Sequence, residues 1–368
     1  MFGRFVAGIG VGYALTIAPV YNSELAPTAA RGFLTSFPEI FSNFGIGAIP
    51  SLFMGILVLI MPESPRWLVM KGRLGDAKQV LLKTSASTLE AESRLLAIQE
   101  AAGIPLDCTN DVVKVPKVEK GHEVWKELLL HPTPIVRRIL LAAIGIHFFQ
   151  QASGIDAVVL YSPRIFKKAG IVSESALLGA TVAVGFVKTF AILISTFLLD
   201  KVGRRPLLLS SVGGMIVSVT LLAVGLTMVY QNPDKKLMWA ISLSIAMVLF
   251  YVGFFSMGLG PITWVYSSEI YPLRLRAQGT SLGVGVNRLM SGIIGTTFLS
   301  MTKALTTGGS FFLFAGICVI AWLFFYKFLP ETRGRNLEDM DALFGKKKQC
   351  SDEINNGHVE LGTTSSKV

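Results

Sequence analysis

The stretch YSSEIYPLRLRAQG at residues 266–279 repeats, with changes, the stretch YNSELAPTAARG at residues 21–32. In both copies a tyrosine precedes a glutamate by three positions, a proline follows that glutamate by three, and an arginine follows it by seven. Each copy comes directly after an apolar span. A second pair of motifs follows in the same order, PESPRW at residues 62–67 and PETRGR at residues 330–335. Two repeated motifs in one order predict a chain built from two homologous halves.

The composition around these motifs is that of a polytopic membrane protein. Of the 368 residues, 51% are hydrophobic and only 16% are charged, and the mean hydropathy is +0.56. A soluble domain usually carries about 25% charged residues, so this chain has too few polar residues to cover a soluble surface. A membrane helix needs roughly 20 apolar residues, and eight stretches qualify. They are approximately residues 2–21, 33–60, 138–160, 175–199, 206–230, 237–266, 277–300 and 310–329.

The net charge of +10 has two candidate explanations, nucleic-acid binding and membrane topology. If residues 61–137 lie in the cytoplasm and each later span crosses once, most lysines and arginines fall in cytoplasmic loops. That asymmetry is the positive-inside bias of membrane proteins, and the sequence carries no nucleic-acid-binding motif. The charge therefore predicts orientation in a membrane and no nucleic-acid partner.

The cysteines and histidines do not favour an enzyme. The 3 cysteines lie far apart and form no disulfide framework, and the 4 histidines have no metal-ligand spacing. No nucleophile–base set and no phosphate-binding loop is found in the sequence. We therefore expect no enzymatic activity, no metal site and no cofactor.

The two halves differ in length between their paired motifs. Glu24 and Pro62 are 38 positions apart, whereas Glu269 and Pro330 are 61 positions apart. The difference of 23 residues is about one transmembrane helix. Because the earlier interval holds the single stretch 33–60, the sequence predicts a six-plus-six-helix architecture with an incomplete first half. If that stretch crosses once, Glu24 and the central loop cannot share a side, so the side of residues 1–60 stays open.

Six motifs occur along the chain in one order: GRFVAGIGVG (3–12), PESPRW (62–67), QQASGID (150–156), DKVGRR (200–205), GPITW (260–264) and PETRGR (330–335). Together they resemble the sugar porters of the major facilitator superfamily. QQASGIDAVVLYSP and the long central loop look closest to plant polyol/monosaccharide proton symporters. The resemblance spans about residues 2–343; relative to the family, three spans at the start and about 23 residues near residues 45–47 are absent.

The resemblance implies an all-α polytopic membrane protein in four parts. These are a remnant of the N-terminal helix bundle (1–61), a cytoplasmic central loop (62–137), a C-terminal six-helix bundle (138–330) and a cytoplasmic tail (331–368). It also implies secondary active transport of a polyol or monosaccharide by alternating access, coupled to protons, in the lipid of the plasma membrane. The alternative is a truncated, non-transporting isoform or gene-model product that associates with a full-length transporter.

The motif QQASGID lies inside the third apolar stretch, where polar residues are costly unless they face a cavity or partners. Gly154 favours a local break, and broken helices often line transporter sites. Amides suit polyhydroxy substrates because each amide offers donors and acceptors. The resemblance assigns Gln150 and Gln151 to sugar hydroxyl contacts, whereas Asp156 stands where many members have asparagine, a departure that favours linear polyols. A purely structural role between helices is the alternative.

Other polar residues complete the predicted substrate site. Lys188 lies in the middle of an apolar stretch, and we expect it to pair with Asp156; snorkelling to the membrane surface is the alternative. Trp264 offers a flat apolar face and one hydrogen-bond donor, although an aromatic anchor at the membrane interface has the same features. By the resemblance, Trp264 flanks the substrate, Asn287 contacts the sugar, and Glu39 faces the cavity.

Charged residues next to the spans predict a network at the cytoplasmic end, with simple topogenic charge as the alternative. The i to i+7 spacing of the repeated Glu and Arg would place each such pair on one helix face, two turns apart. Exposed pairs of this kind contribute only about 0–1 kcal/mol each. In the family, a cytoplasmic network of this kind latches the outward-facing state. The resemblance assigns to it Glu24, Arg31, Asp200, Arg204, Arg205, Glu269 and Arg276.

Arg4 is the residue that the resemblance assigns to proton coupling. In proton-coupled sugar porters this arginine faces an acidic residue on the first helix, and the sequence as given contains no such helix. We therefore expect proton coupling by the family mechanism to fail in a chain that is complete as written.

Overall fold

The structure, a computed structural model, describes residues 62–333 apart from residues 86, 103, 106–111, 113–120, 170–172, 233–236 and 273–274. The predictions for Arg4, Glu24, Arg31 and Glu39, for the first two apolar stretches and for the tail beyond residue 333 therefore lie outside the described residues. Within the described residues the secondary structure is helical apart from one isolated β-bridge. This agrees with the all-α prediction.

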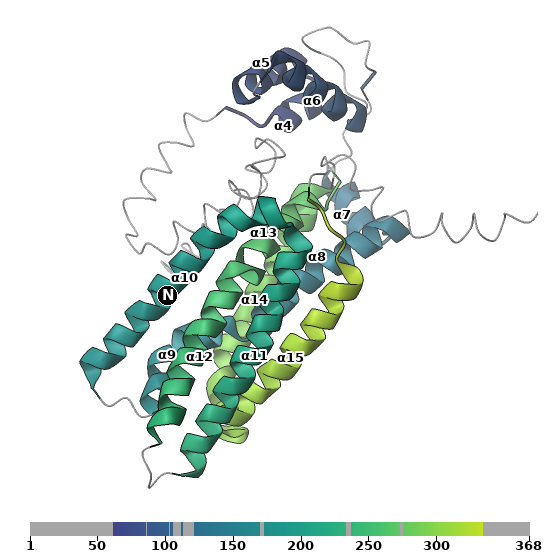
Figure 1. Cartoon of the computed structure of the whole chain (residues 1–368). Helices are drawn as coiled ribbons and strands as arrows, with labels where there is room; N and C mark the ends of the chain where they lie inside the picture. The colour runs from purple at the N-terminus through teal and green to yellow at the C-terminus, as the bar shows by residue number, and fades with distance from the viewer. Residues whose placement is uncertain are drawn as a thin grey trace, which may run out of the picture.

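In the part of the chain that the structure describes, six helical segments form an elongated bundle, in the order in which the apolar stretches predict them (Figure 1). Five of them are long and apolar enough to cross a membrane, whereas the first is broken in two and carries several polar side chains. The segments are α8 (Pro134–Ala152) with α9 (Ile155–Ala169), α10 (Glu174–Val202), α11 (Arg204–Gln231), α12 (Met238–Met257) with α13 (Leu259–Glu269), α14 (Arg276–Ala304) and α15 (Thr306–Phe328).

Two of the segments are broken inside the bundle. Between α8 and α9, Gly154 adopts φ +87°, a left-handed conformation that glycine adopts without steric cost. The hydroxyl of Tyr251 donates to the carbonyl of Ser153 at 2.7 Å, which satisfies a backbone acceptor next to the break. Between α12 and α13 the chain bends at Gly258. The break that the sequence predicts at Gly154 is therefore present.

A single residue, Gly203, separates α10 from α11. Its φ of +106° and ψ of +161° lie in a region that is essentially restricted to glycine. A Cβ at this position would also lie 2.9 Å from Oε2 of Glu331. The motif DKVGRR thus makes the tight turn that its glycine predicts, and the turn carries its charged residues to one end of the bundle.

The core of the bundle lies around α11, which packs against both α12 and α15. Small residues let these helices approach closely, as is usual between membrane helices. Gly225 of α11 lies against Ser244 of α12, and Gly308 of α15 lies against Thr227 of α11. The side chains of Met215, Val219 and Leu222 are fully buried at this seam.

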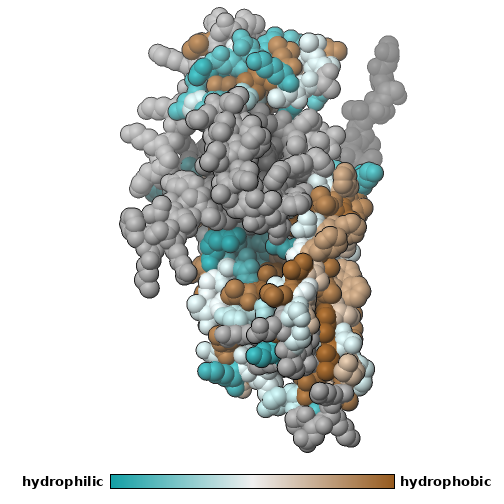
Figure 2. All heavy atoms as spheres, turned by 90° about the vertical axis from the view of Figure 1, so that its left-hand side faces the viewer, coloured by the Kyte–Doolittle hydropathy of each residue, from teal (hydrophilic) through white to brown (hydrophobic). Residues whose placement is uncertain are grey.

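The central loop contains helices of its own. They are α4 (Pro65–Met70), α5 (Leu74–Thr84), α6 (Thr88–Ala101) and α7 (Gly121–Leu129). The first three pack around a small apolar core that includes Val69, Ala77, Leu81 and Ile98. This unit lies beyond the end of the bundle at which α10 meets α11 (Figure 1). Figure 2 shows hydrophilic residues gathered on the unit and hydrophobic residues along the bundle below it.

One expectation about local structure is wrong. Glu269 and Arg276 do not lie on one helix face two turns apart, because α13 ends at Glu269 and α14 begins at Arg276. The intervening Pro272 explains the interruption, since a proline lacks the backbone N–H and disfavours helical conformation in the residue before it. The two residues instead stand at the ends of two consecutive helices.

Candidate functional site

Three of the predicted substrate-site residues form one buried cluster of amides, which we call the amide cluster: Gln150, Gln151 and Asn287. The Asn287 Nδ2 donates to Oε1 of Gln150 at 2.6 Å, and the Gln151 Nε2 donates to Oδ1 of Asn287 at 3.2 Å. The Gln150 Nε2 donates to the carbonyl of Gly260 at 3.0 Å, beside the break between α12 and α13. The cluster therefore ties together α8, α13 and α14, all three amides being buried.

The hydrogen bonds between α8–α9 and α14 continue beyond the amide cluster at every fourth residue of α14. After Asn287, Ser291 donates to the carboxylate of Asp156. One turn later the hydroxyl of Tyr161 donates to the carbonyl of Gly295 at 3.1 Å. Residues four apart lie on one face of a helix, so a single polar face of α14 holds both parts of the broken segment.

Trp264 is the exception in α13, because every other residue of that helix is buried while Trp264 is only half-buried. The imidazole of His147 meets its indole edge-to-face, with ring centroids 5.3 Å apart. The guanidinium of Arg288 lies 5.8 Å from the centre of the same indole, within the range of a cation–π contact. Trp264 therefore lies beside the amide cluster, with part of its surface open.

His147 is a residue of this site that the sequence interpretation did not include. It is fully buried, and its carbonyl accepts a hydrogen bond from Asn287 at 3.3 Å. Among the described residues, neither of its ring nitrogens has a hydrogen-bond partner, and the same is true of Oε1 of Gln151. The signal in the sequence was its position, one turn before the two glutamines on the same helix face.

The expected ion pair between Lys188 and Asp156 is not formed. Both residues are described, and no ion pair joins them. Asp156 faces α14, where Ser291 donates a hydrogen bond to its carboxylate. Lys188 is half-buried on α10. The pairing is expected because an unpaired lysine in the middle of an apolar span is costly, whereas the packing of α9 directs the carboxylate of Asp156 to a different helix.

At the end of the bundle that holds Gly203, several of the predicted network residues meet in what we call the charged cluster. The guanidinium of Arg204 lies 3.1 Å from the carboxylate of Asp200 and 3.0 Å from that of Glu269. The side chains of Arg204 and Glu269 are only 3% and 1% exposed. The expectation of weak, exposed pairs is therefore wrong here, because the helix ends enclose this pair.

Two further residues complete the charged cluster. The carboxylate of Glu331 accepts the backbone N–H groups of Arg204 and Arg205 at 3.0 and 2.9 Å, at the start of α11. A carboxylate is favourable at a helix N-terminus because it offsets the free N–H groups and the helix dipole. Thr332 donates to Glu269 at 2.9 Å. The motif PETRGR was recognised in the sequence, but its contacts with the charged cluster were not predicted.

The remaining network residues make backbone contacts. Arg205 donates to the carbonyl of Tyr326 at 2.7 Å and lies over that ring at 5.4 Å. Arg276 is buried and donates to the carbonyl of Tyr271 at 3.1 Å. Burial raises the pKa of the Tyr271 phenol. Arg205 therefore ties α11 to the end of α15, while Arg276 closes the turn between α13 and α14.

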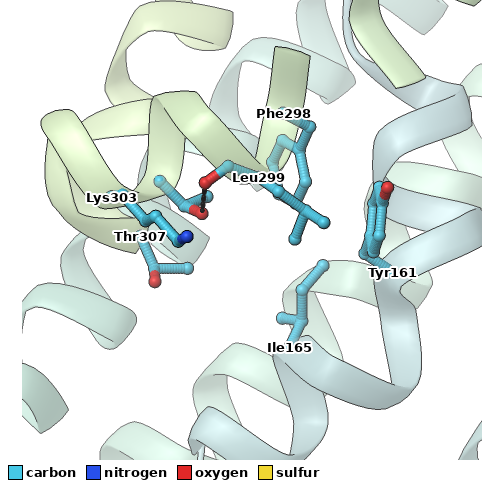
Figure 3. Close-up of a pocket in the computed structure, with 7 residues that line it drawn as sticks. Tyr161, Ile165, Phe298, Leu299, Lys303 and Thr307 are labelled. Atoms are coloured by element: carbon cyan, nitrogen blue, oxygen red, sulfur yellow. Dashed lines mark hydrogen bonds between the residues drawn. The ribbon is translucent and has the colours of Figure 1, made fainter. Parts of the chain in front are cut away.

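A cavity of about 200 Å³ lies at the opposite end of the bundle, between α9, α14 and α15 (Figure 3). Tyr161 and Phe298 stack beside it with ring centroids 5.1 Å apart, and Lys303 lies at its rim. None of the three amides lines this cavity. Within the described ranges, no group of three or more His, Cys, Asp or Glu side chains is placed to hold a metal ion.

Comparison with known proteins places this arrangement among transporters. The profile of a family described as "Sugar (and other) transporter" matches residues 1–47 and 42–344. The two matched segments meet where the repeat predicts a missing stretch, so the chain resembles the family on both sides of that point.

Individual proteins are similar over most of the chain. Polyol transporter 5 of Arabidopsis thaliana is 61% identical over 370 residues, which cover 94% of this chain and 68% of that protein. Glucose transporter GlcP of Staphylococcus epidermidis is 31% identical, covering 93% of this chain and 75% of that protein. The solved structure of the proton:xylose symporter XylE, bound to 6-bromo-6-deoxy-D-glucose, superposes with a TM-score of 0.75 at 27% identity. That superposition covers 93% of this chain and 73% of XylE.

Proposed function

The chain belongs to the sugar transporter family of the major facilitator superfamily, and from this we propose that it carries a polyol or monosaccharide across a membrane by alternating access, coupled to protons. The family is one of integral, multi-pass membrane transporters and not of enzymes. The 61% identity to a polyol transporter favours polyols as the substrate class. Transport of a small solute also accounts for polar side chains in the middle of a membrane bundle.

The observation that carries the proposal is the amide cluster beside two helix breaks. Polar groups at this depth are costly unless they serve partners or a solute. Gln150, Gln151 and Asn287 present both N–H donors and carbonyl acceptors, the combination that a polyhydroxy compound needs. The half-open indole of Trp264 adds an apolar face for C–H groups. We assign these four residues to substrate binding.

The charge near this site supports a preference for linear polyols. Asp156 of α9 accepts a hydrogen bond from Ser291 of α14, and Arg288 of the same helix α14 lies over Trp264. A flexible chain of hydroxyls can adapt to charged donors and acceptors on two helices, whereas a rigid sugar ring presents its hydroxyls in fixed directions. We therefore include Asp156 in the proposed site. Lys188 remains a proposed residue of the substrate site, although it does not pair with Asp156. Glu39 is also proposed for this site, on the resemblance alone.

The charged cluster is the proposed latch of the transport cycle. Arg204, Glu269 and Asp200 link α10, α11 and α13, and Glu331 links the chain after α15 to the same point. Rearrangement of such contacts at one end of the bundle would accompany alternating access. Arg205 and Arg276 support the latch through backbone contacts. Glu24 and Arg31 are the proposed counterparts from the first half.

The proposed orientation rests on the distribution of basic residues along the chain. The basic residues favour a cytoplasmic position for the end that holds Gly203 and for the α4–α6 unit. We propose the plasma membrane as the location. Arg4 is the proposed proton-coupling residue by resemblance to the family.

A second candidate function has one specific observation in its favour. The family profile matches in two segments that meet at residues 42–47, and the first repeat is 23 residues shorter than the second. A chain with such an internal deletion would not form the complete first half of the transporter. It would act instead as a non-transporting membrane protein that associates with a full-length relative.

Uptake by purified protein in liposomes tests the proposal. We expect time-dependent uptake of labelled sorbitol, inositol or glucose that a proton gradient increases, and loss of uptake in Gln150→Ala. Protein that is well inserted but takes up none of these compounds would contradict the transport proposal. In that case, recovery of a full-length relative with the tagged chain from a co-expressing membrane would support the second candidate.

A further inference from the structure

His147 is buried at a point where several elements of the proposed site converge. It lies on α8, its carbonyl accepts from Asn287, and its ring meets the indole of Trp264 edge-to-face at 5.3 Å. Edge-to-face aromatic pairs have a preferred geometry and stabilise it beyond the area that they bury. The imidazole therefore restrains the indole as well as filling space.

The space for this imidazole is made by Gly283 on α14. A Cβ at Gly283 would lie 2.5 Å from Cδ2 and 3.0 Å from Nε2 of His147. Distances this short require a shift of the imidazole, and such a shift would alter its edge-to-face contact with Trp264. Two glycines on the same helix, Gly285 and Gly292, have no atom within 4 Å of such a Cβ. Gly279 of α14 also lacks room for a Cβ, which would lie 2.3 Å from the Tyr271 ring, but Gly283 is the described glycine of this helix whose Cβ would meet His147.

Trp264 is restrained by side chains on two different helices. His147 of α8 contacts the indole at its edge, and Arg288 of α14 lies 5.8 Å from its centre. The rest of α13 is buried, so the open part of the indole is the part of this helix that a solute can reach. A small rotation of the indole would change the direction of its exposed apolar face and its contact with the guanidinium of Arg288.

We propose that His147, seated against Gly283, is a positioning residue that sets the orientation of Trp264 and thereby the affinity for polyol substrates. The expected effect on substrate affinity rests on the proposed transport function, whereas the expected effect on the orientation of Trp264 does not. The ring of His147, rather than its nitrogens, carries the role, because neither nitrogen has a partner among the described residues. A side chain that keeps an aromatic ring at this position should therefore keep the function.

The kinetic experiment compares variants by the KM and Vmax of sorbitol uptake, with inserted protein measured in each preparation. We expect His147→Ala and His147→Gln to raise KM by about tenfold, the scale of one lost aromatic contact, with little change in Vmax. His147→Phe should stay close to the native KM. If His147→Ala does not insert into the membrane, the KM values of His147→Phe and His147→Gln test the proposal. A native KM for Gln together with a raised KM for Phe would overturn the proposal.

The role of Gly283 is tested with a matched glycine on the same helix. Gly283→Ala should raise KM as His147→Ala does, whereas Gly285→Ala should not. The double variant His147→Ala with Gly283→Ala should be no worse than either single variant, because both remove the same contact. Additive increases in KM would show that the two residues act independently and would contradict the proposal.

A spectroscopic arm separates this inference from the transport proposal. A chain in which Trp264 is the only tryptophan carries Trp67→Phe, Trp125→Phe, Trp239→Phe and Trp322→Phe. In that background, removal of the imidazole in His147→Ala and its displacement in Gly283→Ala should lower the fluorescence anisotropy of Trp264, whereas His147→Phe should leave it unchanged. Unchanged anisotropy in all three would overturn the positioning role even if uptake is normal. Absence of uptake with the expected anisotropy changes would reject the transport proposal alone.

Discussion

The amide cluster in the middle of the bundle and the charged cluster at its end are both buried and polar, but they differ in chemistry. The charged cluster joins Arg204 to two carboxylates and also satisfies the backbone at the start of α11 through Glu331. The amide cluster consists of neutral groups and leaves Oε1 of Gln151 without a partner among the described residues. Both clusters join helices, but the amide cluster also leaves a hydrogen-bond acceptor that a bound hydroxyl could use.

The difference follows from the cost of burying each kind of group. A buried charge must stay paired, since an isolated one costs several kcal/mol, so a charged cluster favours one arrangement strongly. An unpaired amide oxygen costs about 1–3 kcal/mol, which a bound hydroxyl or water can offset. A transporter needs both properties. It requires contacts that distinguish one conformation from another, and a site that accepts a solute and releases it.

The largest expected effect is at the charged cluster. Arg204→Met leaves the 1% exposed carboxylate of Glu269 without its ionic partner and should destabilise the protein by about 3–5 kcal/mol. Thermal unfolding in detergent measures it. The control is Arg73→Ala, which removes an exposed pair with Asp76 of 53% and 47% exposure and should cost under about 1 kcal/mol. Equal losses of unfolding free energy in the two variants would mean that burial does not make the Arg204–Glu269 pair more important for stability than an exposed pair.

The amide cluster should show a smaller loss of stability and a larger loss of transport. Asn287→Ala removes the partner of both glutamines and should destabilise the protein by about 2–3 kcal/mol, with sorbitol uptake abolished. Uptake per inserted molecule and unfolding temperature are measured on the same preparation. Thr296→Val, at an exposed position of the same helix, serves as the control. Retained sorbitol uptake in Asn287→Ala would contradict a role of the amide cluster in substrate binding.

The turn at Gly203 tests whether the charged cluster depends on its backbone. Gly203→Ala places a side chain at φ +106° and close to Glu331, so it should cost about 1–3 kcal/mol. Gly213→Ala on α11 meets no atom within 4 Å and should be neutral or slightly stabilising. Unfolding curves of the two variants provide the measurement. A neutral Gly203→Ala would show that the turn does not position Glu331.

The smallest expected effect concerns the pair that the structure does not form. Lys188→Met and Asp156→Asn should be additive within about 0.5 kcal/mol, since no ion pair joins the two residues. A double-mutant cycle on stability and on uptake measures the coupling. A coupling energy well above this limit would restore the original expectation of a Lys188–Asp156 pair and would widen the proposed site towards α10.

Several elements of the fold could be predicted because their cause is local. Apolar length predicts the six described segments, and Gly154 predicts the break between α8 and α9. The continuous helix from Glu269 to Arg276 was predicted wrongly, although Pro272 was visible in the sequence. The spacing of seven residues matches two turns of a helix, but a proline between the two residues interrupts the helix.

The membrane class, the repeat of two halves and the motifs of the family resemblance can be read from composition and from the order of residues along the chain. Which polar groups meet depends on how the helices pack. Gln150 and Asn287 are 137 residues apart, and Arg204 and Glu269 are 65 apart. His147 reaches Trp264 only because Gly283 of a third helix leaves room for it. Contacts of this kind depend on the rotation and packing of whole helices, which the spacing within one segment does not specify.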